Sequence, residues 1–213
     1  MVGKPRPAWL GAALAALLAC GPGGGEEVSF LASDAVQVGG RLVGNGRAAV
    51  LVLPSGAPAS WHGFADRLAE DGYRVLVLEF RPSDDPRLLA RDVLGAVEFL
   101  EAPRLVVVAE AERGELALGM AGGHPVAGVA ILSPVAPEPG LAELARGVSA
   151  PKWLGSAIGD HQAVQAQRVV EANSPPPVDS KLYPGSARGA ELLAGSAVAD
   201  DILSFLGELL ENR

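Results

Sequence analysis

The strongest constraint on the fold of this chain is a repeating alternation between two kinds of apolar segment. From Val28 onward, short runs rich in valine, leucine and isoleucine alternate with longer runs whose apolar residues recur at helical spacing. Short β-branched runs are typical of buried strands, and the longer amphipathic runs are typical of helices that cover a sheet. This alternation predicts a mostly parallel sheet with helices on its two faces.

The pattern places the predicted elements along the whole chain after Val28. Strands are expected at 28–31 and 36–43, as an antiparallel opening hairpin, and then at 48–53, 75–80, 105–109, 126–132, 152–156 and 181–183. Helices are expected at 60–71, 86–100, 115–121, 141–146, 162–172 and 198–210. No stretch is left for a cap domain, and 213 residues suit one hydrophobic core. We therefore expect a single three-layer α/β domain over 28–213.

The first 20 residues have the outline of an export signal. Lys4 and Arg6 precede an apolar run, 8–19, which ends at Cys20, the only cysteine of the chain. The run is shorter than the roughly 20 residues of a membrane-spanning helix. The segment 17–20, Leu-Leu-Ala-Cys, resembles a bacterial lipobox, in which the cysteine is acylated and becomes the first residue of the mature protein. An ordinary secreted protein with one unpaired thiol is the alternative.

The segment 20–27 is predicted to act as a lipidated tether. Its glycine-rich part, 21–25, is flexible by composition, and several acyl chains on Cys20 would supply a stable anchor. Gly21 stands where an aspartate would resemble an inner-membrane retention signal, so an outer membrane is favoured in a cell that has one. Once the signal peptide, 1–19, is removed, 15 of the 17 basic residues remain against 25 acidic ones. This balance argues against a nucleic-acid partner, because phosphate binding needs a basic patch.

Two segments resemble the α/β-hydrolase superfamily, and most closely its small esterases and dienelactone-hydrolase-like members, which have no lid. Ser60 and Trp61, followed by the Asp-Gly-Tyr-Arg-Val segment 71–75, resemble the region after the oxyanion loop of that family. The run 182–193 resembles the region that carries the catalytic histidine of the family in front of a glycine. The resemblance covers about 28–210 and implies a hydrolase fold.

The same resemblance implies that the catalytic triad is degenerate. The nucleophile of the family lies in a G-x-S-x-G turn between a strand and a helix. A gap-free alignment places Ala109 and Arg113 at the two glycines and Ala111 at the serine. Arg188 falls at the histidine, while Asp160 matches the acid of the family. An alanine methyl has no lone pair for attack, and arginine stays protonated at neutral pH, so neither residue can do the chemistry.

Three residues could rescue activity. Glu112 could act as a carboxylate nucleophile if the turn were shifted by one residue, with Gly114 as the second glycine. His161 follows Asp160 and could swing toward the site, although it is more typical of a solvated loop pair. Ser55 lies in the oxyanion-type loop, where a serine between proline and glycine usually has a structural role.

The vacated site is expected to hold an ion pair. Arg188 should lie near Asp160, and Glu110 or Glu112 could approach from the turn after the strand. His62 and His124 are expected at the surface, and Trp61 and Trp153 are expected to pack inside. With no paired Cys or His spacing we expect no metal and no cofactor.

Two classes of function follow. The first, which the missing residues favour, is a noncatalytic lipoprotein of the cell envelope that binds a small molecule or a protein, or acts as a scaffold. The second is an active esterase that works through unusual residues. Fold alone does not separate them, because activity depends on the site.

Overall fold

The computed structural model describes residues 24–135 and 140–210, and it confirms the predicted α/β class. The described strands are β1 (Glu26–Leu31), β2 (Gln37–Val43), β3 (Ala48–Leu53), β4 (Arg74–Glu79), β5 (Arg104–Glu110), β6 (Gly128–Leu132), β7 (Lys152–Ala157) and β8 (Val178–Tyr183). The α-helices are α1 (His62–Glu70), α2 (Pro86–Leu100), α3 (Arg113–Gly123), α4 (Gly140–Gly147), α5 (His161–Asn173) and α6 (Ser196–Leu210). Two 3-10 helices, η1 (Pro58–Trp61) and η2 (Gly189–Ala194), precede α1 and α6.

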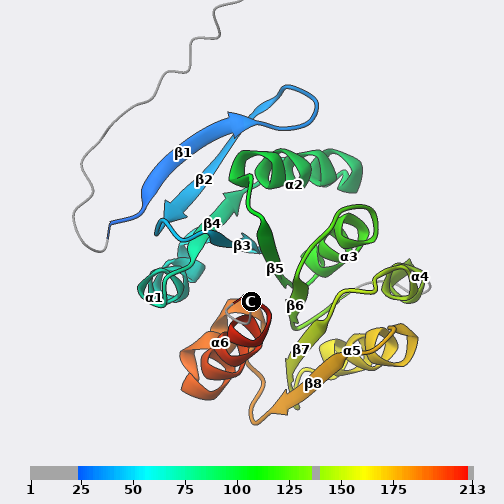
Figure 1. The fold of residues 1–213 in the computed structure, drawn as a ribbon. Helices are drawn as coiled ribbons and strands as arrows, with labels where there is room; N and C mark the ends of the chain where they lie inside the picture. The colour runs from blue at the N-terminus through cyan, green and yellow to red at the C-terminus, as the bar shows by residue number, and fades with distance from the viewer. Residues whose placement is uncertain (1–23, 136–139, 211–213) are drawn as a thin grey trace, which may run out of the picture.

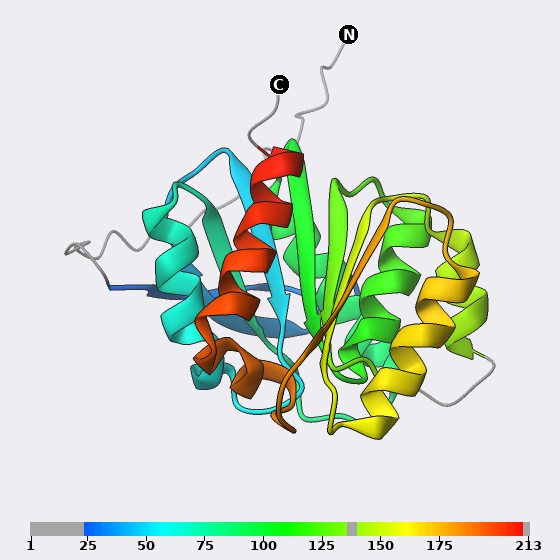
Figure 2. The same ribbon diagram turned by 90° about the horizontal axis from the view of Figure 1, so that it is seen from below.

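The strands form one sheet in the order β1-β2-β4-β3-β5-β6-β7-β8 (Figure 1). β2 pairs antiparallel with both β1 and β4, and the pairs from β4 to β8 are parallel. Helices α2 to α5 cover one face, while α1 and α6 cover the other (Figures 1 and 2). The predicted antiparallel hairpin at the start of the chain is therefore confirmed.

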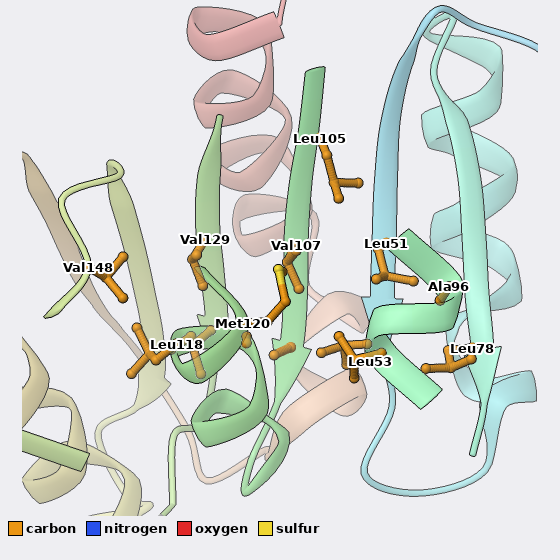
Figure 3. Packing of buried hydrophobic residues seen from close by; sticks show 14 of the residues in the cluster. Leu51, Leu53, Leu78, Ala96, Leu105, Val107, Leu118, Met120, Val129 and Val148 are labelled. Carbon is orange, nitrogen blue, oxygen red and sulfur yellow. The ribbon is translucent and has the colours of Figure 1, made fainter. Parts of the chain in front are cut away.

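Both faces of the central strands are buried, which explains their continuous apolar sequences. Val50 and Val52 face the α1 and α6 side, whereas Leu51 and Leu53 face the other side, and all four are fully buried. On that second face, Met120 of α3 reaches toward the sheet, where the side chains of β3, β5 and β6 gather (Figure 3). Each fully buried Leu or Val stabilises the fold by roughly 1.5–3 kcal/mol relative to an exposed one.

Most predicted boundaries differ from those of the structure by one or two residues, and the clearest differences lie at β8 and at the two 3-10 helices. β8 begins at Val178, because Lys152 donates its backbone N–H to Pro177 and opens the ladder there. Its polar residues on a half-exposed edge strand weakened the sequence signal. The first two residues of the helix predicted at 60–71 belong to η1, and η2 was not predicted.

Parallel strands bring the loops that follow β3, β5, β6, β7 and β8 to the same edge of the sheet. Functional residues of α/β sheets gather at this carboxyl edge. None of the helices in the described part of the chain is long and apolar enough to cross a membrane. Cys20 and the predicted signal peptide lie outside the described residues.

Candidate functional site

The turn between β5 and α3 has a strained backbone centred on Ala111. Its φ is 50°, in the left-handed region that residues with a Cβ rarely adopt. Its N–H donates to the carbonyl of Leu132 at 2.9 Å, and its side chain is buried. A sharp turn of this kind, from a strand into a helix, is how α/β hydrolases expose a nucleophile. Here the structure places a methyl group at that turn.

Glu112 follows this turn and is not its strained residue. Its φ is −64°, so the left-handed conformation falls on Ala111, as in the gap-free alignment. Gly114 lies in the first turn of α3, where an added Cβ would lie 2.9 Å from Ile131 Cγ2. The close approach of α3 to the sheet explains this glycine.

Asp160 and Arg188 form a bidentate ion pair at the same edge of the sheet. Arg188 donates from Nε to Asp160 Oδ2 at 2.7 Å and from Nη2 to Oδ1 at 2.6 Å. The Asp160 side chain is only 4% exposed, whereas that of Arg188 is 48% exposed. Asp160 also caps α5, because Oδ1 accepts a hydrogen bond from the N–H of Ala163 at 3.1 Å. The predicted approach of Arg188 to Asp160 is therefore confirmed.

The ion pair fixes the protonation of both groups. The hydrogen bond from Arg188 lowers the pKa of Asp160 against the opposing effect of burial, and the Ala163 N–H lowers it further. Asp160 in turn raises the pKa of Arg188, with a smaller contribution from the charge of Glu112. Both carboxylate oxygens of Asp160 are thus bound to a permanent cation, and neither is left to orient a base.

Glu110, which ends β5, is held by N–H groups from three different segments. Oε2 accepts hydrogen bonds from the backbone of Ser55 at 3.1 Å and from Trp61 Nε1 at 2.9 Å, and Oε1 accepts one from the backbone of Ala190 at 3.1 Å. The loop after β3 supplies an oxyanion-hole donor in α/β hydrolases. In this chain the N–H of Ser55 in that loop already binds a carboxylate.

The sequence does not predict these contacts of Glu110. Of the two acids expected near Arg188, Glu110 binds the backbone of Ala190, and Glu112 acts on Arg188 through its charge. The sequence signal for such contacts is an acidic residue at the end of a buried strand, because a buried carboxylate needs hydrogen-bond donors.

Ser133 and Gly189 also line the site, next to Arg188. Ser133, fully buried with a φ of 48°, accepts a hydrogen bond at Oγ from the N–H of Gly189 at 3.0 Å. Gly189 has a φ of 53°, and a Cβ there would lie 1.9 Å from Glu110 Oε1. Only glycine fits this position, because any side chain would displace the bound carboxylate.

The structure brings two of the three rescue candidates together. Ser55 donates from Oγ to Glu112 Oε1 at 2.7 Å on the exposed side of the site. His161 is exposed in the first turn of α5, where its charge slightly lowers the pKa of Asp160.

Of the predicted aromatic and histidine positions, Trp61 contacts the site. Trp61 and Trp153 are fully buried, as predicted, and Trp61 donates a hydrogen bond to Glu110. His62 is partly exposed and His124 is exposed. Within residues 24–135 and 140–210, no cluster of three or more His, Cys, Asp or Glu side chains is arranged to hold a metal ion.

A hollow of about 370 Å³ flanks the turn after β5, between the starts of α2 and α3 and Leu144 of α4. Its walls combine three carboxylates, one arginine and apolar side chains: Asp84, Pro86, Leu89, Glu112, Arg113, Glu115, Leu116 and Leu144. Burial raises the pKa of Glu115. The Arg113 guanidinium lies over the Phe80 ring, 4.8 Å from its centre.

Comparison with known proteins gives matches at the level of structure alone. No protein-family model and no curated protein matches the sequence. The esterase RhEst1 from Rhodococcus sp. ECU1013 superposes with a TM-score of 0.72 at 14% identity, covering 86% of this chain and 99% of its own. The dienelactone hydrolase from Anabaena variabilis ATCC 29413 reaches 0.73 at 18% identity, covering 87% and 99%. The α/β hydrolase GrgF from Penicillium sp. sh18 reaches 0.74 at 14%, covering 88% and 99%.

Proposed function

We propose, starting from the α/β-hydrolase fold that this chain adopts, that it is a noncatalytic lipoprotein anchored through Cys20. In this proposal the exported domain binds a small molecule or a protein, or acts as a scaffold, and does not hydrolyse a substrate. The lipobox-like segment 17–20 supports the anchor. The fold itself is compatible with either class of function, so the proposal depends on the site.

The observation that carries the proposal is the set of unreactive atoms at a turn with the backbone geometry of a nucleophile turn. Ala111 holds the strained conformation of a nucleophile turn and has only a methyl group to offer. Arg188 binds both oxygens of Asp160 where a histidine base would be oriented. The Ser55 N–H, one of the groups that could bind an oxyanion, is bound by Glu110. Hydrolysis on this fold needs all three functions together.

The hollow beside Glu112 is the place where we expect a bound molecule. Its three acidic side chains outnumber the single arginine, and leucines supply an apolar wall. A ligand with a cationic group and an apolar part matches this lining. A screen that follows thermal unfolding should find compounds of this kind that raise the Tm, and Glu115→Gln should reduce that rise.

The central test is chemical labelling of the purified full chain with a fluorophosphonate probe, together with turnover of an activated ester. We expect neither labelling nor turnover. The double variant Ala111→Ser/Arg188→His restores a nucleophile and a base but leaves the Ser55 N–H bound to Glu110, so labelling of this variant would show that the first two groups alone were the block. Labelling of the unmodified chain would contradict the proposal.

The second candidate is an active esterase with unusual residues, and the hydrogen bond from Ser55 to Glu112 favours it. A carboxylate at 2.7 Å from a hydroxyl could accept its proton as the oxygen attacks. If this candidate is correct, ester turnover falls to background in Ser55→Ala and in Glu112→Gln. Ser60→Ala is the matched control, because Ser60 is exposed nearby and its Oγ donates only to the carbonyl of Ala57.

A further inference from the structure

β8 is the last strand of the sheet, and one side of its backbone is open to a further strand (Figure 1). Lys152 donates its N–H to Pro177 and Ile158 donates its N–H to Tyr183 at the two ends of the β7–β8 ladder. Along a strand, the backbone N–H and C=O groups of successive residues point alternately to its two sides. Those of Asp179 and Lys181 therefore also face β7. Those of Val178, Ser180 and Leu182 therefore face away from the sheet.

The side chains of β8 can pair favourably with those of a second β8 that runs in the opposite direction. Asp179 and Lys181, 51% and 36% exposed, lie on either side of Ser180 and on the same face as α6. When two such strands run antiparallel with Ser180 opposite Ser180, each Asp179 lies opposite a Lys181. Val178 then lies opposite Leu182 on the α5 face. Opposite charges and apolar pairs stabilise directly opposed positions.

We propose that β8 pairs antiparallel with β8 of a second copy of this chain, across a two-fold axis at Ser180. This register joins all the outward-facing backbone groups of Val178, Ser180 and Leu182 in hydrogen-bonded pairs. The other two symmetric registers of similar length are excluded by charge. Centring on Asp179 opposes two aspartates, and centring on Lys181 opposes two lysines.

The proposed interface also covers an apolar side chain that is exposed in the single chain. Leu182 is 46% exposed, and in this register it lies beside Val178 of the second copy. The opposite edge of the sheet has no such complementarity. β1 carries Glu26 and Glu27 and no basic residue, so two copies of β1 could not pair their charges.

A lysine on an edge strand ordinarily discourages pairing with another chain, and prolines at 177 and 184 limit this edge to six residues. In the proposed register the lysine does not meet another lysine. Lys181 already binds Asp201 of α6 at 2.8 Å, and an ammonium has two further donors for Asp179 of the second copy. The short edge then favours one register over extended aggregation.

Sedimentation of the full chain carrying Cys20→Ser, at increasing concentration, tests this pairing. We expect a monomer–dimer equilibrium. Asp179→Lys and Lys181→Asp each oppose like charges at both symmetric positions, so each should weaken the dimer about tenfold or more. Mixing these two variants should restore dimers, because each then meets its opposite charge. Glu98→Lys, an exposed acid on α2, is the matched control and should leave the dimer unchanged.

Three results on the oligomeric state would contradict the pairing of β8 with β8. A chain that stays monomeric at all concentrations overturns the proposal, as does a dimer that both single variants leave intact, or two folded monomeric variants that do not associate when mixed. Lys181→Asp loses the bond to Asp201, so thermal unfolding must show that it is folded. If it is not folded, Asp179→Lys alone decides the matter. Added salt screens charges, so it should strengthen the dimer of Asp179→Lys, in which like charges repel, and weaken the dimer of the unmodified chain. The same salt response in the two chains would contradict the proposal.

Discussion

At the scale of single residues, the turn after β5 has a left-handed backbone at Ala111, and in our proposal a methyl group stands there in place of a nucleophile. Ala111 retains a left-handed φ of 50°, which costs of order 1 kcal/mol or more for a residue with a Cβ. Asp160 remains buried, and a buried carboxylate needs a partner whether or not it takes part in catalysis. Arg188 meets that need.

Arg188→Ala should destabilise the chain by about 1–2 kcal/mol at neutral pH. Removal of one partner from a buried pair costs more than this, and the half-exposed Arg188 side chain reduces the effect. The pKa of Asp160 is lowered in the folded state, so the pairing contributes above the unfolded pKa of about 3.9 and is lost as pH falls further. Urea unfolding at neutral pH and below about pH 3 should show the difference between the two chains shrinking with acid. Arg188→Lys keeps the charge and should lose less.

Glu110→Ala should cost about 2–4 kcal/mol, because it leaves the N–H groups of Ser55, Trp61 and Ala190 without their acceptor. Glu110→Gln keeps one acceptor oxygen and should cost about 1 kcal/mol. Urea unfolding followed by tryptophan fluorescence measures both. Glu112→Ala is the matched control, since the Glu112 carboxylate is exposed. If Glu112→Ala lowers the free energy of unfolding as much as Glu110→Ala does, the three hydrogen bonds to Glu110 do not stabilise the fold.

At the scale of elements, a second ion network ties the N-terminal hairpin to the rest of the sheet. Arg81, just after β4, binds both oxygens of Asp34 in the β1–β2 turn at 2.8 and 2.9 Å and binds Asp92 of α2 at 2.7 Å. The Asp92 side chain is fully buried. A hairpin at the edge of a sheet has few neighbours, so this clamp fixes it against α2.

Arg81→Met should lower the urea midpoint more than Arg91→Met does, since Arg91 contacts Asp34 from the exposed side at 3.6 Å. The hydrogen bonds from Arg81 lower the pKa of Asp34 to about 2 against the opposing effect of burial. The clamp therefore contributes fully above the unfolded pKa of about 3.9 and is lost as pH falls toward about 2. An acid titration of stability should be shallower in Arg81→Met across this window. Equal slopes in the two variants would contradict this role.

At the scale of the whole molecule, we propose that a lipid anchor at Cys20 and a glycine-rich tether precede the one domain. The described chain enters β1 directly after Gly24 and Gly25, on the edge of the sheet opposite β8. In the two proposals the edges have different tasks, since the β1 edge would lead to the membrane anchor and the β8 edge would pair with a second copy. A dimer would bring two anchors to one membrane and strengthen attachment through effective concentration.

Cys20→Ser should move the protein from the membrane fraction to the soluble fraction of the cell envelope, because acylation requires the thiol. Fractionation of cells followed by immunoblotting measures this shift. Ser29→Cys/Cys20→Ser, which moves the thiol to a partly exposed position on β1, should also be soluble. A Cys20→Ser protein that stays in membranes would indicate that the apolar run 8–19 remains attached as an anchor.

The sequence by itself determined the order of elements and the residue types at the turn after β5, where Ala111 lies. Period and composition are local properties, so the valine-rich runs and the helical stripes could be predicted from their own residues, and the short segment 105–118 placed Ala111 in the turn without a gap. Edge strands carry a weaker pattern, which is why the first half of β8 was not predicted.

Only the tertiary structure decided the strand order and the partners of the buried charges. Glu110 binds groups 55 and 80 residues away in the chain, and Arg188 reaches Asp160 across 28. No local pattern encodes such contacts, because a buried charge takes whichever donors the folded sheet brings to its edge. Which strand lies at that edge, and what it exposes to a second copy, follows from the packing of all the others.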